Sequence, residues 1–91
     1  MREIIISNNF TVDEATEYRE KMNELIGKGE KHFGMDFSKC DFIDSTGLGV
    51  LVAVYKKIKE IDGKFELRSI NNPQVMKIFT LTRLDKVFDI K

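Results

Sequence analysis

The sequence predicts an α/β domain with a mainly parallel or mixed sheet of four strands and three or more helices. Short runs of β-branched and aromatic residues alternate with longer segments whose apolar residues recur at helical spacing. This alternation is typical of parallel strands joined by helical crossovers. The 91 residues are 42% hydrophobic and include one proline, with no repeat or linker. We therefore expect a single domain over residues 1–91.

The first strand and the first helix are predicted in the first third of the chain. Residues Glu3 to Ser7 form a β-branched apolar run, which predicts a strand. Thr11 and Glu14 have the spacing of a capping box, in which both side chains bond free N–H groups at a helix start. A helix is expected to run to about Lys28, because its apolar residues share one face: Ala15, Tyr18, Met22, Leu25 and Ile26.

Two further strands flank the predicted central helix. Residues His32 to Phe37 predict the second strand, which a short irregular connection joins to the helix start. Asp44 suits the N-cap of that helix, which is expected to end near Ile61. Residues Lys64 to Ser69 alternate polar and apolar side chains, which predicts a third strand.

The last part of the chain predicts a third helix and a possible fourth strand. Asn72 is a good cap for a helix whose first residue is Pro73 and which continues through Phe79. Residues Val87 to Ile90 form the candidate fourth strand.

Sites in parallel sheets form beyond the carboxyl ends of the strands. Three polar segments follow predicted strands in this way, and we expect them at one edge of the sheet: Asn8 with Asn9, Asp44 with Ser45, and Asn71 with Asn72. Functional residues are expected at this edge.

Composition narrows the classes of function. The 15 basic and 15 acidic residues give no net formal charge, which argues against nucleic acid as the main partner. The single Cys40 cannot form an internal disulfide and has no zinc-ligand set around it, so we expect no metal or cofactor and a reducing compartment. No apolar run is long enough for a signal peptide or a membrane span. We therefore expect a cytoplasmic, monomeric protein.

Two glycines lie in the first turns of the central helix, at Gly47 and Gly49. Each glycine inside a helix costs about 1 kcal/mol relative to alanine. Either neighbouring backbone packs too closely there for a Cβ atom, or another molecule approaches the helix. The glycines alone favour neither explanation.

The same helix has two apolar stripes. The first is expected to face the sheet and consists of Leu48, Leu51, Val52, Tyr55 and Ile58. The second lies on roughly the opposite side and consists of Val50, Val54 and Ile61. Packing on a neighbouring helix is the simpler explanation for Val54 and Ile61. Val50, which is nearest to Gly47, is the better candidate for contact with a partner.

The segment Phe42-Ile43-Asp44-Ser45-Thr46-Gly47-Leu48-Gly49-Val50-Leu51 closely resembles the STAS domain of bacterial anti-sigma factor antagonists. That family has an apolar pair, then Asp-Ser-Ser/Thr-Gly-Leu-Gly and an aliphatic helix. The resemblance extends from about Ala15 to Ile90 and includes Met35 to Ser38 and Ile61 to Leu67. Ten consecutive positions in the right flanking order make the signal specific.

The resemblance implies a partner switch without catalysis. In the family, the unmodified domain binds an anti-sigma factor that is also a serine kinase, and phosphorylation ends the binding until a serine phosphatase resets the domain. The phosphorylated residue corresponds to Ser45, with Thr46 as a weaker candidate. The expected partner-binding surface comprises Asn9, Thr11, Asp44, Ser45, Thr46, Gly47, Leu48, Gly49 and Val50.

The sequence departs from the family pattern in three places. An additional N-terminal strand, usual in the family, has no counterpart, so we expect a shortened N-terminus. Thr11 stands where the family usually has an aspartate near the kinase-binding surface, which puts the identity of the kinase in doubt. Thr82 and Arg83 replace a usual Ser-Gly pair, which predicts a local change at a helix end.

Three other interpretations compete with the switch. Hydrolysis would need a base beside Ser45, but the only histidine, His32, is predicted at the opposite end of its strand. Phosphate or nucleotide binding at Gly47 and Gly49 lacks both the third glycine of a dinucleotide motif and the Lys-Ser/Thr of a P-loop. A STAS domain could also serve another partner, such as a stress-signalling complex, a cyclase or a lipid transporter.

Overall fold

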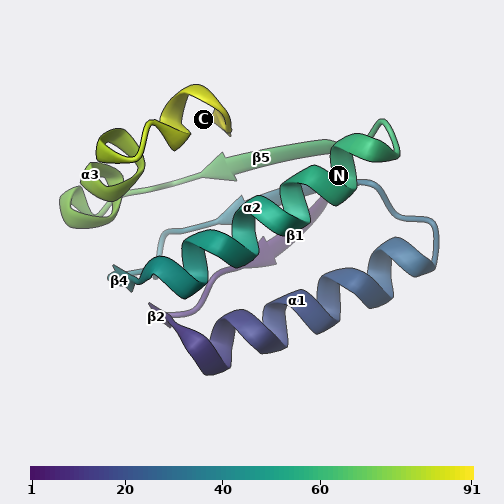
Figure 1. The fold of residues 1–91 in the computed structure, drawn as a ribbon, viewed down its shortest axis with the longest axis horizontal. Helices are drawn as coiled ribbons and strands as arrows, with labels where there is room; N and C mark the ends of the chain where they lie inside the picture. Colours follow the sequence, from purple (N-terminus) through teal and green to yellow (C-terminus); the bar gives the residue numbers. More distant parts are fainter.

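The computed structural model describes all 91 residues, and its elements follow one another as shown in Figure 1. The strands are β1 (Arg2–Ile5), β2 (Asn9–Phe10), β3 (His32–Asp36), β4 (Phe42–Ile43), β5 (Lys64–Arg68) and β6 (Asp89–Ile90). The helices are α1 (Val12–Gly27), α2 (Ser45–Glu60), α3 (Pro73–Leu81) and the 3-10 turn η1 (Leu84–Lys86). None of these helices is both long and apolar enough to cross a membrane.

The main sheet has four strands in the order β1-β3-β5-β6, and every neighbouring pair is parallel. The predicted α/β class and four-stranded sheet are therefore confirmed. A second sheet was not predicted: β2 and β4 pair in parallel, with Asn9 opposite Phe42 and Phe10 opposite Ile43. Phe42 and Ile43 were expected to lie in the short connection before the central helix, and this expectation is wrong because they form β4.

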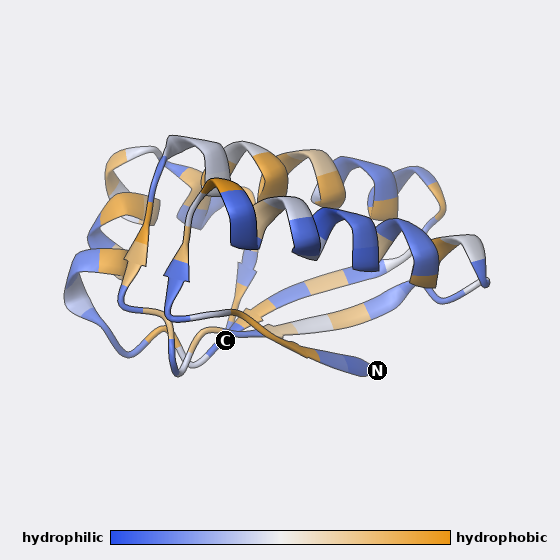
Figure 2. Ribbon diagram, turned by 90° about the horizontal axis from the view of Figure 1, so that it is seen from below, coloured by the Kyte–Doolittle hydropathy of each residue, from blue (hydrophilic) through white to orange (hydrophobic).

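The helices α1 and α2 lie side by side over one face of the main sheet (Figures 1 and 2). The strand register gives the two faces different character. One row across the sheet, on the helix side, is apolar and consists of Ile4, Met35, Leu67 and Ile90. The next row, on the far side, consists of Glu3, Gly34, Glu66 and Asp89. Such alternation places the core between the sheet and the two long helices.

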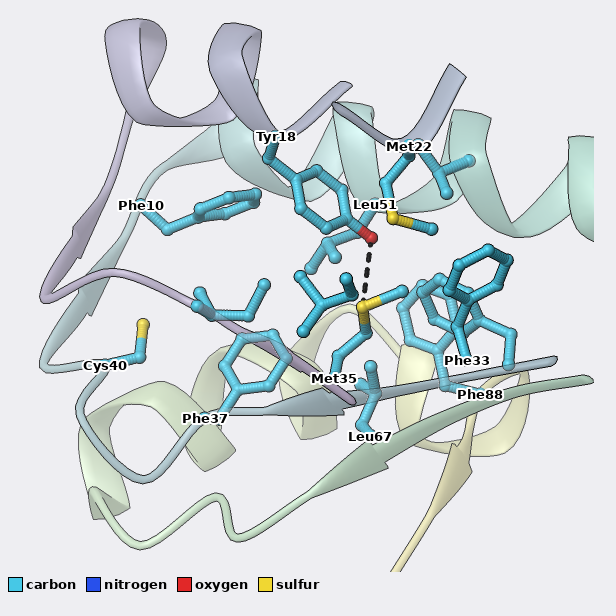
Figure 3. Close-up of a cluster of buried hydrophobic side chains, with 14 of the residues drawn as sticks. Phe10, Tyr18, Met22, Phe33, Met35, Phe37, Cys40, Leu51, Leu67 and Phe88 are labelled. Carbon is cyan, nitrogen blue, oxygen red and sulfur yellow. Dashed lines mark hydrogen bonds between the residues drawn. The ribbon is translucent and has the colours of Figure 1, made fainter. Parts of the chain in front are cut away.

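The core is a cluster of 20 buried apolar residues (Figure 3). The Tyr18 hydroxyl is inside it and donates a hydrogen bond to Met35 Sδ at 3.4 Å. Burial raises the pKa of Tyr18 because the phenolate would lose its hydration. Tyr55 packs edge-to-face on both Phe65 and Phe88, which ties α2 to β5 and to the C-terminal segment.

The helix starts were predicted with mixed success. Asp44 and Asn72 are N-caps whose side chains accept backbone N–H bonds, as expected. Thr11 is also at an N-cap position, but its side chain caps no N–H group. Its hydroxyl instead donates to Glu14 Oε2 at 3.3 Å, so the predicted capping box is wrong.

Candidate functional site

The polar segments predicted to meet at the carboxyl edge of the sheet do meet there. The Asp41 N–H donates to Asn8 O at 2.8 Å. The Asp41 carboxylate accepts from Asn72 Nδ2 at 3.4 Å and, with the Asn8 amide turned to its favourable orientation, from Asn8 Nδ2 at 2.9 Å. The loop before α2 is therefore held by the segments that follow β1 and β5.

Two side chains between the end of β3 and β4 have shifted pKa values. The Asp36 carboxylate accepts the Ser38 N–H at 2.8 Å, and hydrogen bonding to Ser38 lowers the pKa of Asp36. Burial raises the pKa of the Cys40 thiol. Cys40 is buried in the core.

Asp44 sets the start of α2. Its backbone is extended, and its Oδ1 accepts the Gly47 N–H at 2.8 Å. This bond satisfies one of the free donors of the first turn. Ser45 is consequently the first helical residue, at the positive end of the helix dipole.

Ser45 and Thr46 are both exposed to solvent. The Ser45 hydroxyl forms no hydrogen bond within the chain, so nothing in its own domain holds or covers it. His32 begins β3 at the amino end of the strand, whereas Ser45 lies beyond the carboxyl ends. The structure thus brings no histidine to Ser45.

The two glycines of α2 have opposite surroundings. A Cβ atom on Gly47 would lie 2.3 Å from the backbone oxygen of Phe10, so close packing explains this glycine. A Cβ atom on Gly49 would meet nothing within 4 Å. Gly49 therefore leaves open space on the outer side of α2, one turn after Ser45.

The remaining residues of the expected surface differ in accessibility. Asn9 is exposed, and Thr11 is half-buried at the start of α1. Because β2 pairs with β4, the starts of α1 and α2 lie at the same end of the molecule (Figure 1). Leu48 and Val50 are half-buried and pack against the core, which leaves only part of each side chain available.

The apolar stripes of α2 are arranged differently from the prediction. Val54 is buried, as packing against a neighbouring helix would require, and belongs to the core with Leu51 and Ile58. Ile61, in contrast, is 39% exposed. The assignment of the second stripe to helix packing therefore applies to Val54 and not to Ile61.

One exposed apolar residue at this end was not selected from the sequence. Phe42 is 51% exposed on β4, three residues before Ser45, while its neighbour Ile43 is buried. The signal was present in the strand alternation of Phe42 and Ile43, but a two-residue strand is too short to be recognised from periodicity. Large exposed aromatic side chains are common anchors in protein interfaces.

Comparison with known proteins identifies relatives of the whole chain. A family model described as STAS domain matches residues 4–91. The Anti-sigma-B factor antagonist of Bacillus subtilis is 28% identical over 88 residues, which cover 97% of this chain and 79% of that protein. The Anti-sigma F factor antagonist of Paenibacillus polymyxa is 30% identical over 73 residues, which cover 79% of this chain and 62% of that protein. The chain thus spans less than two thirds of the second relative.

Solved structures share the fold. A crystal structure of a Thermotoga maritima protein, provisionally named an anti-sigma factor antagonist, has a TM-score of 0.86 at 30% identity and covers 97% of this chain and 77% of that one. SpoIIAA has been solved as an anti-sigma factor antagonist in its unphosphorylated form and as a Bacillus cell fate determinant in the phosphorylated form. Both structures have a TM-score of 0.76, and the similarity covers 98% of this chain. The unphosphorylated form is 18% identical, with 76% of its chain covered, and the phosphorylated form is 19% identical, with 80% of its chain covered. At that identity the likeness concerns the fold alone.

Proposed function

The chain belongs to the STAS domain family, and from that premise we propose that it is an anti-sigma factor antagonist acting as a phosphorylation-controlled switch. In this proposal the unmodified chain binds an anti-sigma factor that is also a serine/threonine kinase. Phosphorylation of Ser45 ends the binding, and a serine phosphatase restores it. The cycle would regulate transcription in the cytoplasm. Relatives named as anti-sigma factor antagonists support the proposal.

The observation that carries the proposal is the accessibility of Ser45. A protein kinase must take the hydroxyl into its own active site, so the serine needs to be exposed and free of internal hydrogen bonds. Ser45 meets both conditions at the tip of α2. The open space at Gly49 gives a second protein room to approach beside it.

A phosphate on Ser45 would alter the surface more than the fold. It adds a charge of about −1.5 to −2 at neutral pH. The helix N-terminus tolerates an anion, because free N–H groups and the helix dipole favour negative charge there. A partner that meets Ser45 with acidic or apolar groups would lose binding energy, and each ~1.4 kcal/mol lowers the affinity about tenfold.

The proposed contact surface lies around the start of α2. It includes the exposed residues Asn9, Ser45, Thr46 and Gly49, together with the accessible parts of Thr11, Leu48 and Val50. Asp44 and Gly47 support this surface: Asp44 caps the start of α2, and Gly47 packs closely against the backbone of Phe10. We include no catalytic step, since no side chain is hydrogen-bonded to the Ser45 hydroxyl and the neighbouring Asp44 carboxylate caps the helix by accepting the Gly47 N–H.

A STAS interaction module for a different partner is the second candidate. The observation that favours it is Thr11, which replaces a family aspartate and is half-buried with its hydroxyl directed to Glu14. A stress-signalling complex, a cyclase or a lipid transporter subunit could then take the place of the kinase. The proteins that co-purify with the chain distinguish the two candidates.

Calorimetry with the ATP-binding kinase that co-purifies with the chain tests the proposal. Ser45→Asp should weaken binding about tenfold or more, because it places a negative charge at the contact. Ser45→Ala should bind like the native chain and resist phosphorylation. Thr46→Ala, the neighbouring exposed hydroxyl, is the matched control and should still accept phosphate. Equal affinity of the native chain and Ser45→Asp, together with phosphate on Thr46 alone, would remove Ser45 from the mechanism.

A further inference from the structure

A hollow on the outer surface of the molecule lies between α1 and α2, which run side by side (Figure 1). It has a volume of about 190 Å³ and is lined by Arg19 and Asn23 of α1 and by Ala53, Val54 and Lys57 of α2. Val54 is buried and forms an apolar floor, whereas the other four residues are exposed. The hollow is therefore open to solvent and accessible to another molecule.

Each helix contributes one cation to the hollow. The Lys57 ammonium donates to Asn23 Oδ1 at 2.8 Å, which holds its charge between the two helices. Arg19 lines the hollow from α1, and neither cation forms a salt bridge within the chain. No acidic residue lines the hollow, although the chain has as many acidic as basic residues. Two unpaired positive charges in one concave site attract an anion.

The hollow is continuous with the proposed contact surface around Ser45. Ser45, Gly49, Ala53 and Lys57 follow one another at intervals of four residues, so they form one row along α2. The row is about 18 Å long, because each residue adds about 1.5 Å to a helix. Gly49 and Ala53 place no long side chain between Ser45 and the hollow, and the space at Gly49 is open. A protein that covers Ser45 can therefore extend along α2 into the hollow.

We propose that the hollow receives an acidic side chain of the protein that binds at Ser45. The carboxylate of an aspartate or glutamate of that partner would lie between the Arg19 guanidinium and the Lys57 ammonium. Asn23 Nδ2 would be a further hydrogen-bond donor to it. The inference rests on the proposed function and adds a second contact to it, about 18 Å from Ser45 along α2.

The charge of the hollow decides which kind of surface can cover it. Apolar side chains of a partner would remove water from two cations without pairing them, which is unfavourable. Basic side chains would add like charge. A carboxylate pairs with both cations and can accept two parallel hydrogen bonds from a guanidinium. The contact should also speed association at low ionic strength, since complementary surface charges steer the encounter of two proteins.

Charge reversal on each side of the hollow tests the proposal. Calorimetry with the kinase used for Ser45 should show about tenfold weaker binding for Arg19→Glu and for Lys57→Glu. Lys57→Arg keeps the charge and should bind like the native chain. The matched control Lys21→Glu makes the same charge change on the side of α1 next to β1 and should also bind like the native chain. All three positions are exposed, so circular dichroism should show an intact fold for each variant.

Cross-linking identifies the chemistry of the group that occupies the hollow. A carbodiimide joins a lysine amine to a carboxylate that it contacts, with loss of water. In the complex it should join Lys57 to an aspartate or glutamate of the kinase, which mass spectrometry of the digested product detects. Lys21 should form no such link. Added salt should weaken the binding of the native chain more than that of Lys57→Glu, because salt screens exposed charges.

Unchanged affinity of Arg19→Glu and Lys57→Glu, together with weaker binding of Ser45→Asp, would overturn the inference and leave the switch in place. The reverse pattern, in which the two charge variants bind weakly and Ser45→Asp binds like the native chain, would support the acidic contact and remove the switch. An equal loss of affinity in Lys21→Glu would show only an effect of net charge and would overturn the inference. A Lys57 cross-link to a second copy of this chain, with none to the kinase, would overturn it as well.

Discussion

Gly47 and Gly49 are two positions apart in α2, yet the structure gives them separate roles. Gly47 lies under the backbone of Phe10, where β2 crosses the start of the helix. Gly49 faces open space. The sequence could not distinguish close packing from the approach of a partner, because the packing partner of Gly47 is 37 positions away in the chain.

Alanine substitutions at the two glycines should therefore change stability in opposite directions. Gly47→Ala forces a Cβ atom against a backbone oxygen and should lower the free energy of unfolding by about 1–3 kcal/mol. Gly49→Ala has room and should raise it by about 1 kcal/mol through helix propensity. Urea unfolding followed by circular dichroism measures both values.

Gly49→Ala also tests whether the partner approaches α2 through the open space at Gly49. Gly49→Ala should bind the kinase more weakly than the native chain does, although its fold is more stable. If the more stable variant binds with unchanged affinity, the partner does not approach α2 at Gly49.

Single residues could be predicted where the interaction is local. Asp44 and Asn72 cap helices through N–H groups two or three positions away, and the sequence contains all the information needed. Thr11 has the same local pattern, but its hydroxyl bonds to the Glu14 carboxylate instead of the backbone. The exposure of Ser45 depends on which elements surround α2, so the sequence could only suggest it.

At the scale of the elements, α3 is followed by a residue with an unusual backbone conformation, at a position where the sequence predicts a changed helix end. Arg83 has φ of +62°, in the left-handed region, between α3 and η1. The resemblance had indicated a changed helix ending at this position, where the family usually has glycine. Non-glycine residues pay a steric cost in this region because the Cβ atom approaches the carbonyl oxygen.

Arg83→Gly should therefore stabilise the protein by about 1 kcal/mol, which corresponds to a rise of about 4–8 °C in Tm for a domain of this size. Arg83→Ala keeps the Cβ atom and removes the long side chain, so it should show little of this gain. Calorimetric melting of both variants measures the difference. Equal Tm values for the two would mean that the conformation is not strained.

The elements that were predicted are the long ones, together with β6, which lies within the candidate fourth strand expected over Val87 to Ile90. The helices α1 and α2 and the strands β1, β3 and β5 have enough residues for their periodicity to be recognised, and their bounds agree with the prediction within about two residues. The strands β2 and β4 have two residues each, and η1 has three, so no pattern could reveal them. The missed pair matters for function, because β2 and β4 bring the starts of α1 and α2 together.

At the scale of the whole molecule, the core and the proposed switch occupy different places. The buried cluster lies between the sheet and the inner sides of the helices, while Ser45 lies at the outer tip of α2. A charge added at Ser45 should consequently leave core packing unchanged. The switch can then act through the surface without a large conformational change.

Titration of the kinase with the chain phosphorylated stoichiometrically on Ser45, beside the unmodified chain, tests this account most directly. The account predicts that the unmodified chain binds and that the phosphorylated chain binds at least about a hundredfold more weakly. The amide NMR spectra of the two forms should differ only around the start of α2. Equal affinity of the two forms, or spectral changes throughout the core on phosphorylation, would contradict it.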